Sequence, residues 1–417
     1  MSHFNTFPSP PKLETKPFTV AIPDADVAEL KSLLKASRLG PSTPTNSNPS
    51  DHSLGVSMDW LKTAKQAWET SFDWRAQERR MKSFPQFMTK VPVQIEGKEY
   101  IHDIHFMALF SKKKDAVPLI MLHGWPGSFI EFIPVMGILS KKYTPETLPY
   151  HVVVPSLPGY GFSSGPQSTE FKLADVAKIF NDLMLGLGFD KYVAQGGDVG
   201  SGVARILTMN HDNCKAIHLN MFSIAPPQND DRSILSQAER EALDRGAVFR
   251  QTGWAYGIEQ GTRPNTLGFA LSSSPLALLA WIGEKFLEWS DENPSMDEIL
   301  TDVSIYWFYE LDFHVLLSLQ GVYHPWTRVL QVSRKAYRLY VVPSVPYPIC
   351  FFFPSVAKPL FCPISEIIPV PESWIKQEGN LVFYRQAKSG GHFAALEVPE
   401  VLLKDVEDFV EQVWGSV

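Results

Sequence analysis

Short apolar runs alternate with amphipathic segments through the middle of the chain. Residues 117–122 and 151–154 are almost wholly apolar, and residues 171–187 place apolar side chains at helical spacing. Short continuous apolar runs are typical of strands that are buried on both faces of a parallel sheet. The alternation of strands and helices therefore predicts an α/β fold with a mostly parallel central sheet.

The pattern changes toward helices after about residue 225. Helical spacing recurs until about residue 309, and a strand pattern returns at 381–384, before a closing helix at about 399–414. We interpret the helical region as a cap inserted into the sheet domain. The chain then divides into four parts: an N-terminal extension that packs on core and cap and leads into the first strands (1–115), the first part of the core (116–224), the helical cap (225–345) and the second part of the core (346–417).

The N-terminal extension carries several large aromatic side chains on a helical pattern at 59–80. Such side chains occur in packed cores far more often than in ligand cages, so we expect them to pack against the main domain. Further along the extension, apolar and β-branched residues predict strands at 91–104 and 104–110. The aromatic residues are Trp60, Trp68, Phe72 and Trp74.

Composition narrows the class of protein. Hydrophobic residues make up 44% of the 417 residues and charged residues 20%, as in ordinary soluble proteins. The net charge of -7 argues against a nucleic-acid partner, because proteins that bind nucleic acids usually carry a basic surface. Three scattered cysteines fit neither a disulfide framework nor a zinc site and indicate a reducing compartment. Residues 1–18 do not resemble a signal peptide, and the most apolar window, 344–364, contains five prolines. We expect a soluble, cytoplasmic protein without a membrane anchor.

A glycine-rich corner follows the β-prone residues 191–195 and leads into a helical pattern. Gly196 and Gly200 bracket Asp198 in the spacing of a nucleophile elbow, where the backbone turns so sharply that neighbouring side chains must be tiny. A carboxylate is ionised at neutral pH and can attack an electrophilic carbon directly, leaving an ester. Asp is also a favoured N-cap residue, so this segment alone leaves Asp198 as either nucleophile or helix cap.

Two further segments supply partners for such a nucleophile. His392 stands between a glycine pair and an apolar run after the last predicted strand, and catalytic triads on sheets of this kind follow the order nucleophile, acid, histidine. His123-Gly124-Trp125-Pro126 follows a buried strand and is typical of an oxyanion-hole loop. The amides of Trp125 and Val199 would stabilise the oxyanion that forms when water attacks the ester.

Together, three motifs resemble the microsomal-type branch of the epoxide hydrolases, including its soluble fungal members, in the α/β-hydrolase superfamily. The resemblance covers nearly the whole chain, including the N-terminal extension. The motifs are His123-Gly124-Trp125-Pro126-Gly127-Ser128, Gly196-Gly197-Asp198-Val199-Gly200 and Gly390-Gly391-His392-Phe393.

The resemblance implies a two-step reaction on a small hydrophobic epoxide. Asp198 would open the epoxide to a covalent ester, and His392 would deprotonate a water that hydrolyses the ester to a vicinal diol. The segment Trp254 to Pro264 matches the part of the family's cap that holds a tyrosine, so Tyr256 would donate a hydrogen bond to the epoxide oxygen. The family implies no metal or organic cofactor, and a homodimer is its common assembly.

Two segments depart from the family pattern. The second cap tyrosine lacks its usual surroundings, and Tyr323 is the candidate, with a purely structural role left open. The acid that partners His392 is expected at Glu366, which apolar residues separate from Phe353-Pro354. We hypothesise insertions at about 309–321 and 355–364 that come from retained non-coding sequence or from an error in the predicted gene, which sequencing the transcript of an active protein would test.

Two other functions remain open from the sequence. A haloalkane dehalogenase uses the same Asp and His chemistry, but needs halide-binding donors where this chain has Tyr256. A catalytically impaired binding protein that keeps the hydrolase fold would result if the insertions disrupt the acid loop and the cap. Measuring diol formation, halide release and ligand binding would separate the three functions.

Overall fold

The computed structural model of the protein describes residues 4–48, 53–224, 226–227, 231–309, 345–353, 367 and 369–416. Two predicted site residues, Tyr323 and Glu366, lie outside the described residues, as do nearly all positions of the two expected insertions.

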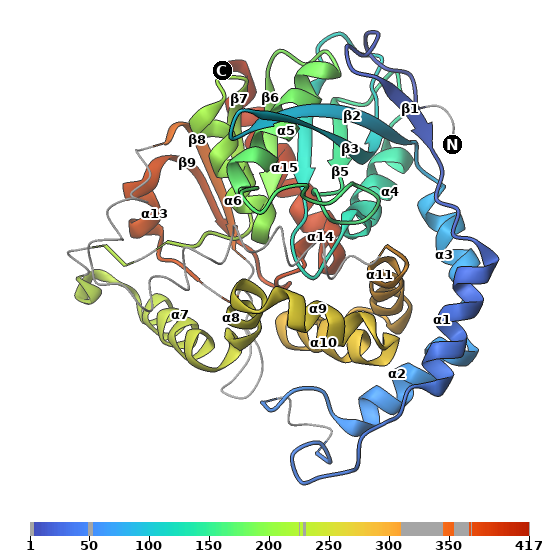
Figure 1. The fold of residues 1–417 in the computed structure, drawn as a ribbon. Helices are drawn as coiled ribbons and strands as arrows, with labels where there is room; N and C mark the ends of the chain where they lie inside the picture. Colours follow the sequence, from blue (N-terminus) through green and yellow to red (C-terminus); the bar gives the residue numbers. More distant parts are fainter. Residues whose placement is uncertain are drawn as a thin grey trace.

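A mixed sheet lies at the centre of the described structure, in the order β1-β2-β3-β5-β4-β6-β7-β8-β9 (Figure 1). Its first strands pair antiparallel as far as β3 with β5, and all pairs from β5–β4 to β8–β9 are parallel. The predicted α/β fold with a mostly parallel sheet is therefore confirmed. The strands are β1 (Thr15–Phe18), β2 (Gln86–Ile95), β3 (Lys98–Leu109), β4 (Val117–Leu122), β5 (Tyr150–Pro155), β6 (Tyr192–Gly196), β7 (Cys214–Leu219), β8 (Val345–Phe353) and β9 (Gly379–Gln386).

One predicted strand boundary is wrong. The run expected as a single strand at 91–104 is divided by a tight turn, where Glu96 and Gly97 have φ angles of 50° and 80°. Positive φ at both central residues is typical of two-residue hairpin turns, whose twist matches that of the paired strands. The chain therefore folds back as the β2–β3 hairpin, in which Ile95 lies opposite Lys98.

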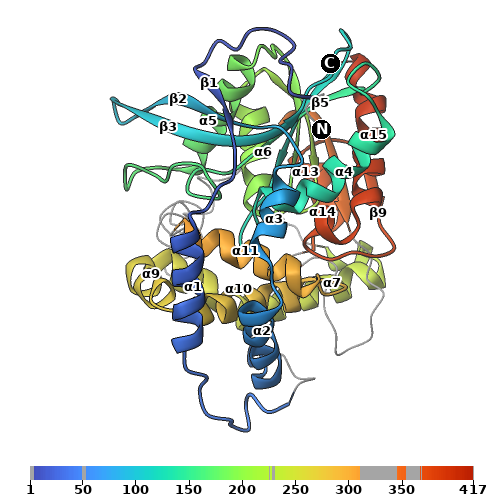
Figure 2. The same ribbon diagram turned by 90° about the vertical axis from the view of Figure 1, so that its right-hand side faces the viewer.

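Helices cover both faces of the sheet. α5 and α6 pack together on one side, and α4, α14 and α15 pack together on the other (Figure 2). Strands β4, β5 and β6 are buried along their whole length, in keeping with their apolar sequences. The helices around the sheet are α4 (Ile133–Lys142), α5 (Leu173–Gly186), α6 (Asp198–Asn210), α13 (Glu372–Glu378), α14 (Ala394–Glu397) and α15 (Pro399–Val413).

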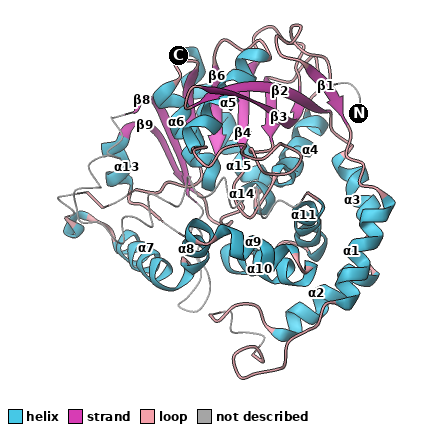
Figure 3. Ribbon diagram, in the orientation of Figure 1, coloured by secondary structure: helices cyan, strands magenta, loops and turns pink. Residues whose placement is uncertain are grey.

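A group of helices from one continuous stretch of chain lies beside the ends of the parallel strands (Figure 3). We call these helices the cap: α7 (Gln237–Val248), α8 (Ala255–Thr262), α9 (Pro264–Ser272), α10 (Pro275–Trp289) and α11 (Met296–Phe308). Among the described residues, no single helix is long and apolar enough to cross a membrane. α9 and α10 pass that test only as a pair, bent by 116°.

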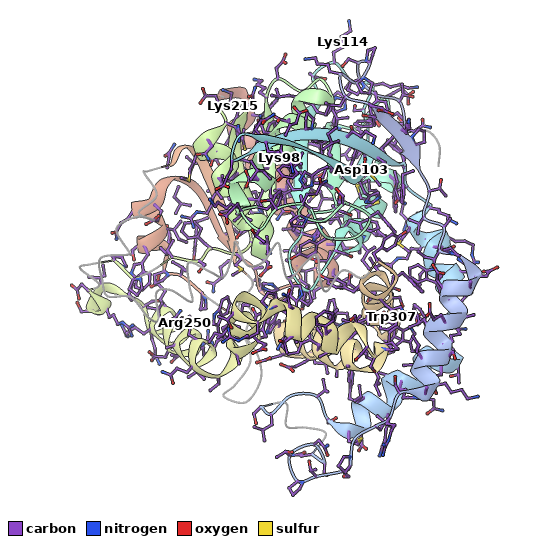
Figure 4. All side chains as sticks on the ribbon, in the orientation of Figure 1. Lys98, Asp103, Lys114, Lys215, Arg250 and Trp307 are labelled. Carbon is purple, nitrogen blue, oxygen red and sulfur yellow. The ribbon has the colours of Figure 1, made fainter. Side chains whose placement is uncertain are left out.

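The N-terminal helices run along the side of both sheet and cap (Figures 1 and 2). Trp68 donates a hydrogen bond to Ser304 on α11 at 3.2 Å, and the ring of Trp74 lies 4.8 Å from the ring of Phe308. The half-buried Trp307 of α11 is labelled near the N-terminal helices in Figure 4. Trp68, Phe72 and Trp74 are thus buried as core residues, as expected, but these contacts of Trp68 and Trp74 are made to the cap and not to the main domain. The helices are α1 (Asp24–Ala36), α2 (Met58–Thr70) and α3 (Trp74–Met81).

Candidate active site

The elbow between β6 and α6 holds Asp198 in a conformation that few non-glycine residues adopt. Asp198 is the first residue of α6 and has a φ of 47°, in the left-handed region. A Cβ atom at Gly196 would overlap the carbonyl of Gly200, and one at Gly200 would overlap the carbonyl of Leu122. The helix therefore starts in direct contact with β4 and β6, which is the strained geometry of a nucleophile elbow. Asp198 is not the N-cap residue, because that position belongs to Gly197.

The loop after β4 contacts the carboxyl group of Asp198. The amide of Trp125 donates a hydrogen bond to Asp198 Oδ1 at 2.9 Å, and the Trp125–Pro126 peptide is cis. A Cβ atom at Gly124 would overlap the Asp198 carboxyl group, so only glycine leaves room for this approach. The predicted donor Trp125 and the predicted nucleophile Asp198 are thus in direct contact.

Hydrogen bonds of the His123 ring stabilise this loop. Its Nε2 accepts a hydrogen bond from the amide of Leu157 at 3.1 Å, and its Nδ1 lies 3.2 Å from the carbonyl of Gly124. Burial lowers the pKa of His123 to about 4, so the ring is neutral at physiological pH. With Nδ1 protonated, the neutral ring donates to Gly124 and accepts from Leu157, which joins two loops at the edge of the sheet.

His392 faces the other oxygen of the same carboxyl group. Its Nε2 lies 3.5 Å from Asp198 Oδ2, and its side chain is almost wholly buried. The amide of His392 donates to the carbonyl of Trp289 at the end of α10, at 2.9 Å, and the two rings meet edge to face at 5.2 Å. The structure therefore brings together the predicted nucleophile and the predicted base, and places the end of a cap helix against the base.

A small cavity lies beside these groups. Its volume is about 20 Å³, and its lining includes Asp198, His392, Gly124 and Glu131. A cavity of this size is large enough for one water molecule, and its walls offer several polar partners. The lining can therefore place a single water next to both the imidazole and the carboxyl group.

Tyr256 lies in the cap against the oxyanion loop. Its ring stacks on Trp125 with centroids 4.9 Å apart and an interplanar angle of 15°, and it also contacts Trp289 at 5.2 Å. The ammonium group of the buried Lys285 lies 4.8 Å from the centroid of the Tyr256 ring, at a cation–π distance. Tyr256, which was predicted from the cap segment, is thus held beside the residue whose amide contacts Asp198.

Two carboxyl groups near the site were not identified from the sequence. Glu131, in the 3₁₀ turn after the loop, lines the small cavity, and its pKa is raised by burial and then by the nearby Asp302. Asp302, on α11, accepts a hydrogen bond from Ser128 at 2.6 Å, and burial raises its pKa to about 8. Glu131 is a lone acid within an otherwise apolar stretch, and this signal could have drawn attention to it. Asp302 shares α11 with Asp297 and Glu298, so no comparable signal marks it in the sequence.

The structure describes only one of the three remaining predicted site residues, Val199. Val199 follows Asp198 in the first turn of α6, where backbone amides have no carbonyl partner within the helix, so its role as a second oxyanion donor stays a prediction. Glu366 and Tyr323 lie outside the described residues, and their roles also stay predictions. Within the described part of the chain, no group of three or more His, Cys, Asp or Glu side chains could hold a metal ion.

Comparisons with known proteins find relatives over nearly the whole chain. The family model for the epoxide hydrolase N terminus matches residues 15–132, and the model for the alpha/beta hydrolase fold matches residues 117–289. The solved structure of the Aspergillus niger epoxide hydrolase is 44% identical and has a TM-score of 0.87, covering 99% of this chain and 100% of its own.

More distant relatives carry the same family name. Epoxide hydrolase 1 of Sus scrofa is 31% identical, over 95% of this chain and 88% of its own length. The solved structure of the juvenile hormone epoxide hydrolase of the silkworm Bombyx mori is 25% identical with a TM-score of 0.80, covering 96% of this chain and 95% of its own. The resemblance noted in the sequence is therefore confirmed, and the chain belongs to the epoxide hydrolases of the α/β-hydrolase fold.

Proposed function

We propose that this epoxide hydrolase converts an epoxide to a vicinal diol through a covalent ester on Asp198. The observation that carries the proposal is the division of the Asp198 carboxyl group between two partners. Oδ1 accepts the Trp125 amide at 2.9 Å, and Oδ2 faces His392 Nε2 at 3.5 Å. One oxygen is thus held in a donor site, while the other is oriented toward the space where the base and a water would act.

In the first step, Oδ2 of Asp198 attacks a carbon of the epoxide ring. The carbon–oxygen bond breaks, its electron pair goes to the epoxide oxygen, and Tyr256 gives that oxygen a proton. Tyr323 would be the second donor. The buried ammonium group of Lys285 beside the Tyr256 ring favours negative charge on the tyrosine during this transfer.

In the second step, water hydrolyses the ester. His392 takes a proton from water, and the water oxygen attacks the carboxyl carbon of Asp198. Oδ1 becomes the oxyanion, stabilised by the amides of Trp125 and Val199. The bond between the carboxyl carbon and Oδ2 then breaks, and Oδ2 leaves with the diol, taking the second proton of the attacking water. The Asp198 carboxylate is restored, and the proton on His392 returns to the tyrosinate. Glu366 would hold the His392 ring and stabilise its charged form.

The first prediction separates the two steps. His392→Gln should form the ester but not hydrolyse it at neutral pH, so intact protein mass should rise by the mass of an aromatic epoxide such as styrene oxide. Asp198→Asn in the same experiment should show no increase. A single turnover of the unmodified protein in ¹⁸O-water should label the Asp198 peptide and leave the diol unlabelled. A labelled diol, or no adduct on the His392 variant, would contradict the covalent route.

The alternatives are not favoured. A haloalkane dehalogenase would lack a use for Tyr256 beside the oxyanion loop, and the relatives named above are epoxide hydrolases. A non-catalytic binding protein was suggested by segments outside the described residues. The distances of 2.9 Å from the Trp125 amide and 3.5 Å from His392 Nε2 to the Asp198 carboxyl group support a catalytic role instead.

We further propose a small hydrophobic epoxide as substrate, because Trp125, Tyr256 and Trp289 give the site aromatic walls. A cytoplasmic homodimer remains part of the proposal. Light scattering of the purified protein would test the assembly, and fractionation of the producing cells would test the location.

A further inference from the structure

One carboxyl group holds the loop that carries the base. Both oxygens of Glu397, five residues after His392, accept hydrogen bonds from backbone amides. Such charge-assisted bonds are among the stronger ones in proteins, and several on one acceptor fix the chain at several points at once. The donors are Asp291 (2.7 Å), Gly391 (3.0 Å) and Glu292 (3.4 Å) to Oε2, and Phe393 (3.1 Å) to Oε1.

These donors come from two parts of the fold. Gly391 and Phe393 flank His392 on either side, so the base sits between two amides bound to the same side chain. The other two donors follow α10, in a segment that we call the cap end (residues 289–292). A single carboxyl group thus joins the loop of the base to the cap.

Further contacts join the same two segments. The His392 amide donates to the Trp289 carbonyl at 2.9 Å, and the Gly390 amide donates to Asp291 Oδ2 at 3.2 Å. A Cβ atom at Gly391 would approach the Asp291 amide and the Trp289 carbonyl too closely, so glycine is needed for the loop to lie against the cap end.

We propose that Glu397 is the positioning residue that orients His392 for ester hydrolysis and couples the cap end to this step. The proposal rests on the proposed function, in which His392 acts only after the ester has formed. Burial raises the pKa of Glu397 to about 7, while the amide hydrogen bonds lower it and so offset part of the cost of the buried charge. Glutamine at this position has one acceptor oxygen in place of two, and its amide group would face a backbone amide.

The second prediction is a selective loss in one step. In Glu397→Gln, rapid-mixing experiments with styrene oxide should give an ester formation rate within about threefold of the unmodified protein. Hydrolysis of the ester should slow by about 30-fold or more, equivalent to about 2 kcal/mol of activation free energy. The ester should therefore accumulate in steady state, visible as an increase in intact mass.

A pH profile distinguishes positioning from general damage. When His392 no longer delivers the proton transfer, hydroxide becomes the nucleophile, so the hydrolysis rate of the Glu397→Gln ester should rise about tenfold per pH unit at alkaline pH. His392→Gln should show the same slope and the unmodified protein a flat profile. Glu400→Gln, which removes an exposed acid from the start of α15, is the matched control and should behave as the unmodified protein.

The outcomes are distinct. Equal losses in both steps, or unchanged hydrolysis in a folded Glu397→Gln variant, would overturn the positioning role. An absence of ester in His392→Gln would instead overturn the proposed function. Should Glu397→Gln fail to fold, Glu397→Asp keeps the charge but withdraws it by one carbon. Asp291→Asn weakens the bond to the Gly390 amide, and both variants should show smaller losses confined to hydrolysis.

Discussion

At the scale of single residues, the site depends on a glycine, because the missing Cβ atom leaves room for a neighbouring side chain. Gly124 lies so close to Asp198 that an added Cβ atom would overlap the Cβ atom and carboxyl group of Asp198, whereas Gly137 in α4 has open space around it. The same substitution should therefore have opposite effects at these two positions.

The third prediction follows from this difference. In Gly124→Ala the added Cβ atom would overlap both the Cβ atom and the carboxyl group of Asp198, so the loop after β4 must move away from the elbow. Ester formation should then fall by about 100-fold, since a displacement of about 1 Å is enough for such a loss. Gly137→Ala should keep full activity and gain up to about 1 kcal/mol of stability, because alanine is the better helix residue. The check is the rate of the mass increase after mixing with substrate. Normal ester formation in Gly124→Ala would show that the close approach is unimportant.

At the scale of elements, helix α11 connects the cap to the oxyanion loop. Asp302 accepts from Ser128 at 2.6 Å, and Tyr306 donates to the carbonyl of Gly127 at 2.9 Å. Asp302 is almost wholly buried, and its burial makes ionisation costly. The stability of this contact between α11 and the oxyanion loop should therefore depend on pH.

The fourth prediction concerns that response. The pKa of Asp302 is raised from 3.8 to about 8 in the folded protein, so this group favours folding below about pH 4, and the contribution is lost as the pH rises through about 8. Asn lacks the titration, so the stability of Asp302→Asn relative to the unmodified protein should increase between pH 4 and 8 by a few kcal/mol, at about 1.4 kcal/mol per pKa unit. Urea unfolding at several pH values measures the difference.

A control on the same helix sharpens this test. Asp297→Asn removes an exposed carboxylate from the first turn of α11 and should follow the pH dependence of the unmodified protein. A constant difference between Asp302→Asn and the unmodified protein across this range would mean that Asp302 is not the titrating group.

Much of the core of the site was predictable from the sequence. The apolar run of β4, the glycine spacing around Asp198 and the glycine pair before His392 are local patterns, and each reflects a local requirement of the backbone. The hydrogen bond between Ser128 and Asp302 was not predictable, because these residues lie 174 residues apart and only the docked cap brings them together. The hairpin turn at Glu96 was missed for a related reason, since only the pairing of β2 with β3 explains its positive φ.

At the scale of the whole molecule, the N-terminal helices brace the cap against the sheet. Trp68 of α2 is fully buried and donates to Ser304 of α11 at 3.2 Å, while α3 leads directly into β2 of the sheet. The extension therefore connects the cap with the sheet, and its loss should destabilise both.

The fifth prediction measures this bracing. Trp68→Ala should lower the free energy of unfolding by about 3 to 5 kcal/mol, as expected for a deleted core aromatic. Ser304→Ala leaves the indole packed but removes its acceptor, and should cost about 1 to 3 kcal/mol. Urea denaturation followed by tryptophan fluorescence provides both values. Equal small losses for the two variants would indicate that the indole contributes little beyond its hydrogen bond.

The strand order also has a consequence for how the protein is made. β7 pairs with β8, yet the entire cap lies between these strands in the sequence. While the ribosome synthesises the cap, β7 is the outer strand of an unfinished sheet, with its amides and carbonyls exposed on one side. Such an edge can pair with another nascent chain. The yield of folded enzyme will therefore depend on how quickly synthesis delivers β8, and slower translation of the cap should increase aggregation.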